Sequence, residues 1–330
     1  MRRPWHATVV ALAGLLTAAG CTASPDLSGG EPPGPGVVAA ARPGPPEPSP
    51  SARPTDPPPA TKGPGTARRT PAAKPPPAPP APRRKYPVLY LGDSFAMESQ
   101  NVLGERIGAT GRGTVHSAPY SGTTLCDYLT GRAVDSLVPP GDKAATLVKA
   151  HRPRVVVLQF WGNSWGFTPC MDNIAQGSPQ YYERYARDAG TLTAQIADAA
   201  RSAGIPRPRI VWVLQGPDPF STDRTQRVNT MYQTQAAATG DTVSDAGRSV
   251  SDPDRRYVWQ QRLPCNDEER ARPGDCVGGL TTLHRDDDPM HFCQAPTTTT
   301  PRPCPVHSPG IVRYSKAITA TVEEYLRGIG

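Results

Sequence analysis

Short apolar runs rich in β-branched residues recur after residue 86 and alternate with helical patterns. The clearest helical pattern covers residues 179–203, where apolar side chains return every three or four positions. Strands that are apolar throughout and separated by helices are typical of a parallel sheet with helices on both faces. We therefore predict a three-layer α/β/α domain that ends in a helix over residues 311–326. Its strands are expected at residues 88–91, 114–117, 155–160, 210–214 and 242–243.

A proline-rich segment precedes this domain. Of the 42 prolines in the chain, 20 lie between Glu31 and Pro82. A segment of this composition cannot bury enough apolar surface to fold, so residues 21–85 are expected to form an extended tether. The sequence thus predicts one folded domain, residues 86–330, which is long enough to bury a full core.

The N-terminus has the order of a bacterial secretory signal. Arg2 and Arg3 are followed by an apolar stretch over residues 7–16, which is too short to span a bilayer comfortably. Small residues then precede Cys21, and this arrangement resembles a lipoprotein signal. We expect residues 1–20 to be removed and Cys21 to carry a lipid anchor at the outer face of the cytoplasmic membrane or in the cell envelope. Release of the cleaved protein without lipidation is the alternative.

The net charge of the chain does not indicate nucleic-acid binding. The signal carries two arginines, and residues 21–85 carry nine Lys or Arg against four Asp or Glu, which accounts for the whole formal charge of +7. The folded domain is therefore formally neutral. A nucleic-acid-binding domain would be expected to present a basic face, and we expect no nucleic-acid partner.

Six cysteines remain in the domain when Cys21 is set aside, an even number that suits an oxidising compartment. Six cysteines allow 15 pairings. The shortest loops come from pairing Cys265 with Cys276 and Cys293 with Cys304, which leaves Cys126 with Cys170. Zinc binding is the competing interpretation, but no C-x-x-C or paired Cys/His spacing is present.

Two short motifs carry the chemistry. Gly92-Asp93-Ser94 directly follows the first apolar run, and Asp288-Pro289-Met290-His291 lies near the C-terminus. A serine hydroxyl needs a neighbouring base before it can attack a carbonyl carbon. His291 is the candidate base, and Asp288 could hold its imidazole in the required tautomer. The competing interpretation takes the acidic run of residues 286–288 as a solvated turn.

These residues resemble the motifs of the SGNH hydrolases, also called the GDSL lipases and esterases. The resemblance covers most of residues 86–330 and makes Ser94 the nucleophile. Gly122, in Tyr-Ser-Gly-Thr-Thr, looks like the glycine whose backbone N–H lines the oxyanion hole, and Asn163 looks like the oxyanion asparagine. The chain departs from the family where glycine stands directly before Asn163 instead of two residues earlier. The resemblance implies a mainly parallel, flavodoxin-like sheet and an oxyanion hole made of Ser94, Gly122 and Asn163.

The sequence therefore predicts an extracytoplasmic serine esterase that acts through an acyl-Ser94 intermediate. Its acyl-ester substrate is expected to be an O-acyl group on envelope carbohydrate. Transfer of an acyl group to an envelope polysaccharide, with a membrane partner as donor, is one alternative, and a non-catalytic binding lipoprotein is another. No metal-ligand spacing, P-loop or dinucleotide-binding motif is present, so catalysis without a cofactor is expected. No sequence feature indicates an oligomeric state.

Overall fold

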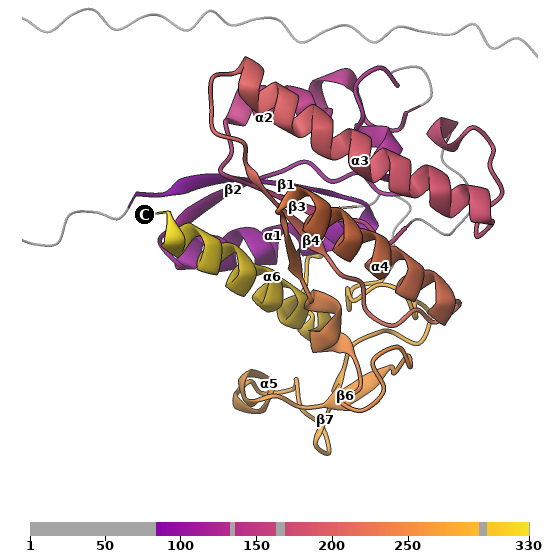
Figure 1. Cartoon of the computed structure of the whole chain (residues 1–330). Helices are drawn as coiled ribbons and strands as arrows, with labels where there is room; N and C mark the ends of the chain where they lie inside the picture. The colour runs from indigo at the N-terminus through magenta and orange to yellow at the C-terminus, as the bar shows by residue number, and fades with distance from the viewer. Residues whose placement is uncertain (1–83, 133–135, 163–168, 297–301, 330) are drawn as a thin grey trace, which may run out of the picture. The chain divides into compact units, whose positions relative to one another are not determined.

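A five-stranded sheet with the strand order β2-β1-β3-β4-β5 forms the centre of the domain, and every neighbouring pair is parallel (Figure 1). The computed structural model describes residues 84–132, 136–162, 169–296 and 302–329. The predicted signal, Cys21 and nearly all of the predicted tether lie outside the described residues. The strands are β1 (Tyr86–Gly92), β2 (Gly113–Ser117), β3 (Val155–Gln159), β4 (Arg209–Val213) and β5 (Thr242–Ser244).

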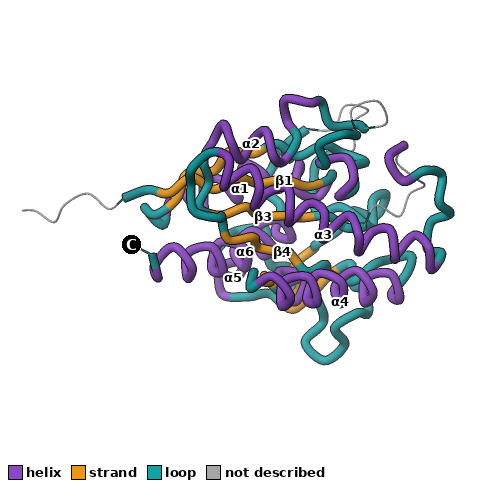
Figure 2. The backbone as a smooth tube through the Cα atoms, turned by 45° about the horizontal axis from the view of Figure 1, so that its top comes forward, coloured by secondary structure: helices purple, strands orange, loops and turns teal. Residues whose placement is uncertain are grey.

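Helices cover both faces of the sheet, which confirms the three-layer α/β/α architecture. Figure 1 shows α2 and α3 above the sheet and α6 below it, and Figure 2 shows β1, β3 and β4 side by side. The helices are α1 (Ser94–Ala109), α2 (Ala144–His151), α3 (Pro179–Ser202), α4 (Thr222–Thr239), α5 (Asp267–Ala271) and α6 (Pro309–Gly328).

Alternate residues of the strands β1, β3 and β4 enter two separate apolar cores. On β1, Leu89 and Leu91 pack into the core that α2, α3 and α4 share. Val88 and Tyr90 enter the opposite core with α1 and α6. Residues on the central strand β3 are all fully buried, because both faces of the sheet are covered at its centre. The edge strand β2 keeps exposed residues.

The two helices that the sequence predicts have clear start signals. Ser178 accepts a hydrogen bond from the backbone N–H of Tyr181 at 3.2 Å, and Pro179 occupies the first turn of α3. Such a cap satisfies one of the N–H groups that a helix start leaves without a partner. Pro309 likewise occupies the first turn of α6, where Ser308 makes no side-chain cap hydrogen bond. Proline suits the first helical position because its missing N–H would have no intrahelical partner there.

A small second sheet follows the main one along the chain. The strands β6 (Arg262–Pro264) and β7 (Leu280–Thr282) pair antiparallel. The segment that connects these two strands contains Cys265 and Cys276, which form a disulfide. No helix in the described parts of the chain is long and apolar enough to cross a membrane.

The strand order decides where a site can form. In the sheet, β2 lies next to β1 on one side, and β3, the next strand along the chain, lies next to β1 on the other side. Loops after β1 and β3 therefore diverge at their carboxyl ends, and flavodoxin-like sheets bind ligands in the crevice at this point. Ser94 follows β1 at this edge.

Candidate active site

The end of β1 places Ser94 at the first position of α1. Gly92 is required there because a Cβ atom on it would lie 2.1 Å from the Gln159 carbonyl oxygen of β3. Asp93 caps α1 by accepting the Phe95 N–H at 3.1 Å. The other oxygen of Asp93 accepts the backbone N–H of Trp161 at 2.6 Å. One carboxylate thus ties the start of α1 to the loop after β3.

Three predicted catalytic residues lie in a hydrogen-bonded row. The Ser94 Oγ is 2.9 Å from His291 Nε2, although the two residues are 197 positions apart. His291 Nδ1 is 3.1 and 3.2 Å from the two carboxylate oxygens of Asp288. A carboxylate only accepts, so Nδ1 carries the proton and Nε2 is left to accept the Ser94 hydroxyl proton. The backbone N–H of His291 also donates to Asp288, at 3.1 Å.

The charges around His291 favour its protonated form. Burial lowers the pKa of His291, but the hydrogen bond to Asp288 and the charges of Glu98 and Asp93 outweigh burial and raise it to about 9. Burial likewise acts to raise the pKa of Asp288, and its bonds to His291 outweigh this and hold the pKa well below the usual range. The pair is thus arranged to stabilise the imidazolium that forms when Ser94 is deprotonated.

This pKa predicts an alkaline-rising activity profile. An imidazolium cannot accept the Ser94 proton, so kcat/KM for an ester should rise about tenfold per pH unit below pH 9 and level off above it. Initial rates of a short p-nitrophenyl ester, corrected for spontaneous hydrolysis at each pH, would measure the profile. A profile that is flat from pH 6 upward would contradict the pKa assigned to His291.

The loop that carries Gly122 lies beside the end of β1. The Tyr120 N–H donates to the Gly92 carbonyl oxygen at 2.9 Å, and Tyr128 Oη donates to the same oxygen at 2.8 Å. Gly122 has a φ of 78°, a conformation that glycine adopts without steric cost. The structure therefore holds Gly122 and the N-terminal turn of α1, which supplies the Ser94 N–H, at the same edge of the sheet.

Asn163, the third predicted oxyanion residue, lies outside the described residues, but the chain leading to it is firmly held. The Trp161 carbonyl oxygen accepts from Arg224 at 2.7 Å. The Gly162 carbonyl oxygen accepts from Tyr181 Oη at 2.7 Å. Trp161 is buried, and the Arg224 guanidinium lies 3.8 Å from its ring centroid. Trp161 thus packs in the interior and does not line the cavity beside Ser94.

A cavity of about 170 Å³ lies beside the hydroxyl of Ser94. Its wall combines the start of α1, the loop that carries Asp288 and His291, and residues at both ends of the Cys293–Cys304 disulfide. Its lining includes Ser94, Met97, Glu98, Arg285, Asp288, His291, Cys293, Arg302 and Cys304. The substrate carbonyl can therefore reach Ser94 from this cavity.

The other histidines that could compete as a base have partners other than Ser94. His284 is buried, and its Nδ1 donates to the His291 carbonyl oxygen at 3.0 Å. Burial lowers the pKa of His284 to about 4, so it is neutral at pH 7. His307 pairs with Asp275 at 2.7 Å, and His116 stacks on His151.

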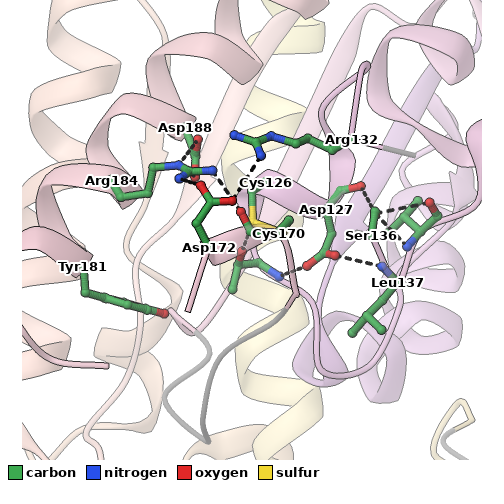
Figure 3. The surroundings of a disulfide bond; sticks show 12 residues. Cys126, Asp127, Arg132, Ser136, Leu137, Cys170, Asp172, Tyr181, Arg184 and Asp188 are labelled. Carbon is green, nitrogen blue, oxygen red and sulfur yellow. Dashed lines mark hydrogen bonds and ion pairs between the residues drawn. A yellow bond between two sulfur atoms is a disulfide. The ribbon is translucent and has the colours of Figure 1, made fainter. Parts of the chain in front are cut away.

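All three predicted disulfides are present in the structure. Cys126 lies in the short 3₁₀ helix η1 (Leu125–Tyr128), which follows the Gly122 loop. Its partner Cys170 lies in η3 (Pro169–Met171), further along the connection after β3. Figure 3 shows this bridge beside Asp127 and the Arg184–Asp188 pair. Within the described ranges, Cys126, Asp127 and Cys170 form the one cluster with metal-ligating atoms, and its cysteines are consumed by the disulfide.

Loss of the Cys126–Cys170 bridge should weaken the domain. It closes a loop of 44 residues, which corresponds to about 4 kcal/mol of unfolding free energy by loop-closure entropy. We expect a Cys126→Ala/Cys170→Ala variant to lose about this much in urea denaturation, and to lose esterase activity because both loops at the site are loosened. The matched Cys265→Ala/Cys276→Ala variant, whose loop spans 11 residues, should lose about 3 kcal/mol and keep its activity. Unchanged stability and activity in the first variant would show that the Cys126–Cys170 bridge does not hold these two loops in place.

Two buried carboxylates at the site have roles that the sequence motifs do not reveal. Asp93 stands within the Gly-Asp-Ser motif, but the motif does not show that its side chain joins α1 to the loop after β3. Glu98 belongs to no motif. The available signal is a charged residue four positions after Ser94, on a helix that must pack against the sheet.

Comparison with known proteins gives structural similarity only. No protein-family profile and no curated protein matches the chain. Among solved structures, a candidate lipolytic protein of the G-D-S-L family from Desulfitobacterium hafniense is 14% identical and aligns over 72% of this chain and 99% of its own, with a TM-score of 0.41.

Two further structures align over a similar share of the chain. A candidate GDSL-like lipase from Parabacteroides merdae is 11% identical, over 73% of this chain and 97% of its own, with a TM-score of 0.40. The psychrotrophic esterase EstA from a Pseudoalteromonas species is 12% identical, over 74% of this chain and 100% of its own, with a TM-score of 0.40. Each of these likenesses is structural, at sequence identities between 11% and 14%.

Proposed function

We propose that the protein is a serine esterase that cleaves acyl esters through an acyl-Ser94 intermediate. The observation that carries this proposal is the row of Asp288, His291 and Ser94, with 2.9 Å between the base nitrogen and the nucleophilic oxygen. Each of the three residues is in the position that its chemical role requires.

In the proposed reaction, Ser94 Oγ attacks the ester carbonyl carbon while His291 Nε2 takes the hydroxyl proton. The carbonyl oxygen becomes an oxyanion, and the N–H groups of Ser94 and Gly122 are the donors proposed to bind it. His291 then returns the proton to the departing alcohol oxygen as its bond to the acyl carbon breaks. A water molecule, deprotonated by the same histidine, then attacks the acyl carbon. The bond from that carbon to Ser94 Oγ breaks, His291 returns the proton to Oγ, and the acid is released.

We place this activity outside the cytoplasm, on O-acyl groups of envelope carbohydrate. The secretory signal, Cys21 and the proline-rich tether support an anchored enzyme that reaches into the cell envelope. Three disulfides in one domain also suit an oxidising compartment. Cys21 lipidation can be measured by metabolic labelling with an alkyne fatty acid, and a Cys21→Ala variant should not incorporate the label.

Product analysis tests the proposed reaction. The full chain is incubated with an ester panel that runs from acetylated sugars to long-chain esters, with and without a polysaccharide acceptor. Free acid as the main product in both conditions supports hydrolysis, whereas acylated polysaccharide in preference to free acid indicates an acyltransferase. A fluorophosphonate that fails to label Ser94, together with no turnover of any ester, would instead indicate a binding protein and overturn the proposal.

A further inference from the structure

Glu98 joins the nucleophile's helix to the segment that carries the base. It lies on α1 one turn after Ser94, so both side chains lie on the same face of that helix. Its two carboxylate oxygens accept the backbone N–H groups of Phe292 at 3.1 Å and Cys293 at 3.0 Å. Those two residues directly follow His291 in the chain.

The main chain of Glu98 makes a third bond to the same region. Its carbonyl oxygen accepts the Cys304 N–H at 3.1 Å. Cys304 is bonded to Cys293, so a single residue of α1 binds both ends of this disulfide. The disulfide and Glu98 line the same cavity as Ser94 and His291.

Burial of a carboxylate costs free energy unless hydrogen bonds compensate for the lost water. Glu98 is 5% exposed, and glutamate is almost never buried to this degree without partners. The hydrogen-bond partners of its carboxylate are the backbone N–H groups of the segment after His291, which solvate the negative charge. Burial raises the pKa of Glu98 to about 7.

Building on the proposed esterase function, we propose that Glu98 is a positioning residue, which fixes the backbone after His291 so that the imidazole stays in line with Ser94 Oγ. The backbone N–H of His291 is bound by Asp288 and its carbonyl oxygen by His284. Glu98 supplies the next two bonds along the chain. Side chains thus bind the backbone groups of His291 and the N–H groups of the two residues after it.

Glu98 also adds negative charge beside the imidazole. Within the described residues, the titratable groups that act on His291 are Asp288, Glu98, Asp93 and His284, and the guanidinium groups of Arg285 and Arg302 line the same cavity. Among the carboxylates, Glu98 acts alongside Asp288 in favouring the imidazolium. Removal of its charge therefore lowers the pH at which His291 becomes neutral.

The test compares Glu98→Gln with Glu98→Asp. Glutamine keeps the shape but offers one acceptor oxygen, and its NH₂ group would face the second backbone N–H. We expect kcat/KM at the plateau to fall about 10²-fold, the loss that a displacement of about 1 Å can cause, and the pH midpoint to move downward. Aspartate keeps the charge but is one methylene shorter, so it should lose a similar factor while the midpoint stays near that of the wild type.

Glu269→Gln is the matched control. Glu269 is also buried, accepts the backbone N–H of Asn266 at 2.9 Å and pairs with Arg313, but it does not line the cavity. This variant should lose thermal stability and keep both the rate and the pH midpoint of the wild type. Circular dichroism melts give the unfolding temperature of each variant, and rates are measured well below it. A rate loss at these temperatures then reports a change at the site and not a loss of folded protein.

The outcomes distinguish this inference from the proposed function. A wild-type protein that hydrolyses esters, beside a Glu98→Gln variant with the wild-type rate and midpoint, would overturn the role of Glu98 and leave the esterase intact. The role of Glu98 would also be overturned if both Glu98 variants lost only thermal stability, as Glu269→Gln does. If Glu98→Gln does not fold, Glu98→Asp is the test, and a wild-type rate in that variant would overturn the role of Glu98. A wild-type protein without esterase activity would overturn the proposed function itself.

Discussion

Replacement of Ser94 by alanine is expected to lower kcat for ester hydrolysis about 10⁶-fold, the loss seen when a serine hydrolase loses its nucleophile. The Oγ atom lies 2.9 Å from His291 Nε2, and no other hydroxyl in the described residues is bonded to that nitrogen. An alanine there leaves the base without a proton to take. The residual rate would come from substrate binding and oxyanion stabilisation alone.

The measurement combines turnover with labelling. A short p-nitrophenyl ester reports kcat, and mass spectrometry of a fluorophosphonate-treated sample reports whether residue 94 is modified. Ser99→Ala is the control, because Ser99 is a buried serine on the same helix that does not line the cavity. It should keep the wild-type rate and the label. Wild-type-like turnover by Ser94→Ala, with the fold intact by circular dichroism, would refute the assigned nucleophile.

The sheet can be predicted closely because its signal is local. A central strand of a sheet covered on both faces is apolar over most of its length, and turns bound it. The expected strand at residues 155–160 is β3, Val155–Gln159, and the expected helix at 179–203 is α3, Pro179–Ser202. The hairpin of β6 and β7 is not predicted, because its paired segments are three residues each and carry no alternating apolar pattern.

The candidate site can be predicted only where its residues belong to a short motif. Asp288 and His291 are three positions apart, and the carboxylate reaches the ring locally. Glu98 meets Phe292 and Cys293 across more than 190 positions, and no spacing in the sequence reports such a contact. Arg224 reaches the Trp161 carbonyl oxygen from α4 in the same way. Packing of helices on the sheet creates these supports, so they become visible only in three dimensions.

Replacement of Asp288 by asparagine is the second large effect expected, a loss of about 10⁴-fold in kcat. Asp288 accepts the ring Nδ1–H of His291 and the backbone N–H groups of His291 and Met290. Asparagine has one acceptor oxygen, which the backbone N–H groups would bind, and its NH₂ group would then donate to Nδ1. That arrangement places the proton on Nε2, where it blocks acceptance of the Ser94 proton.

The pH profile separates this tautomer effect from a loss of structure. The carboxylate raises the pKa of His291, so Asp288→Asn should lower the pH midpoint as well as the plateau. Asp286→Asn is the matched control, since Asp286 belongs to the same acidic run but bonds to Gln261 and does not contact the imidazole. It should keep the wild-type rate and midpoint. An Asp288→Asn variant with the wild-type profile would mean that the acidic run is a solvated turn and that His291 obtains its orientation from Glu98 and His284 alone.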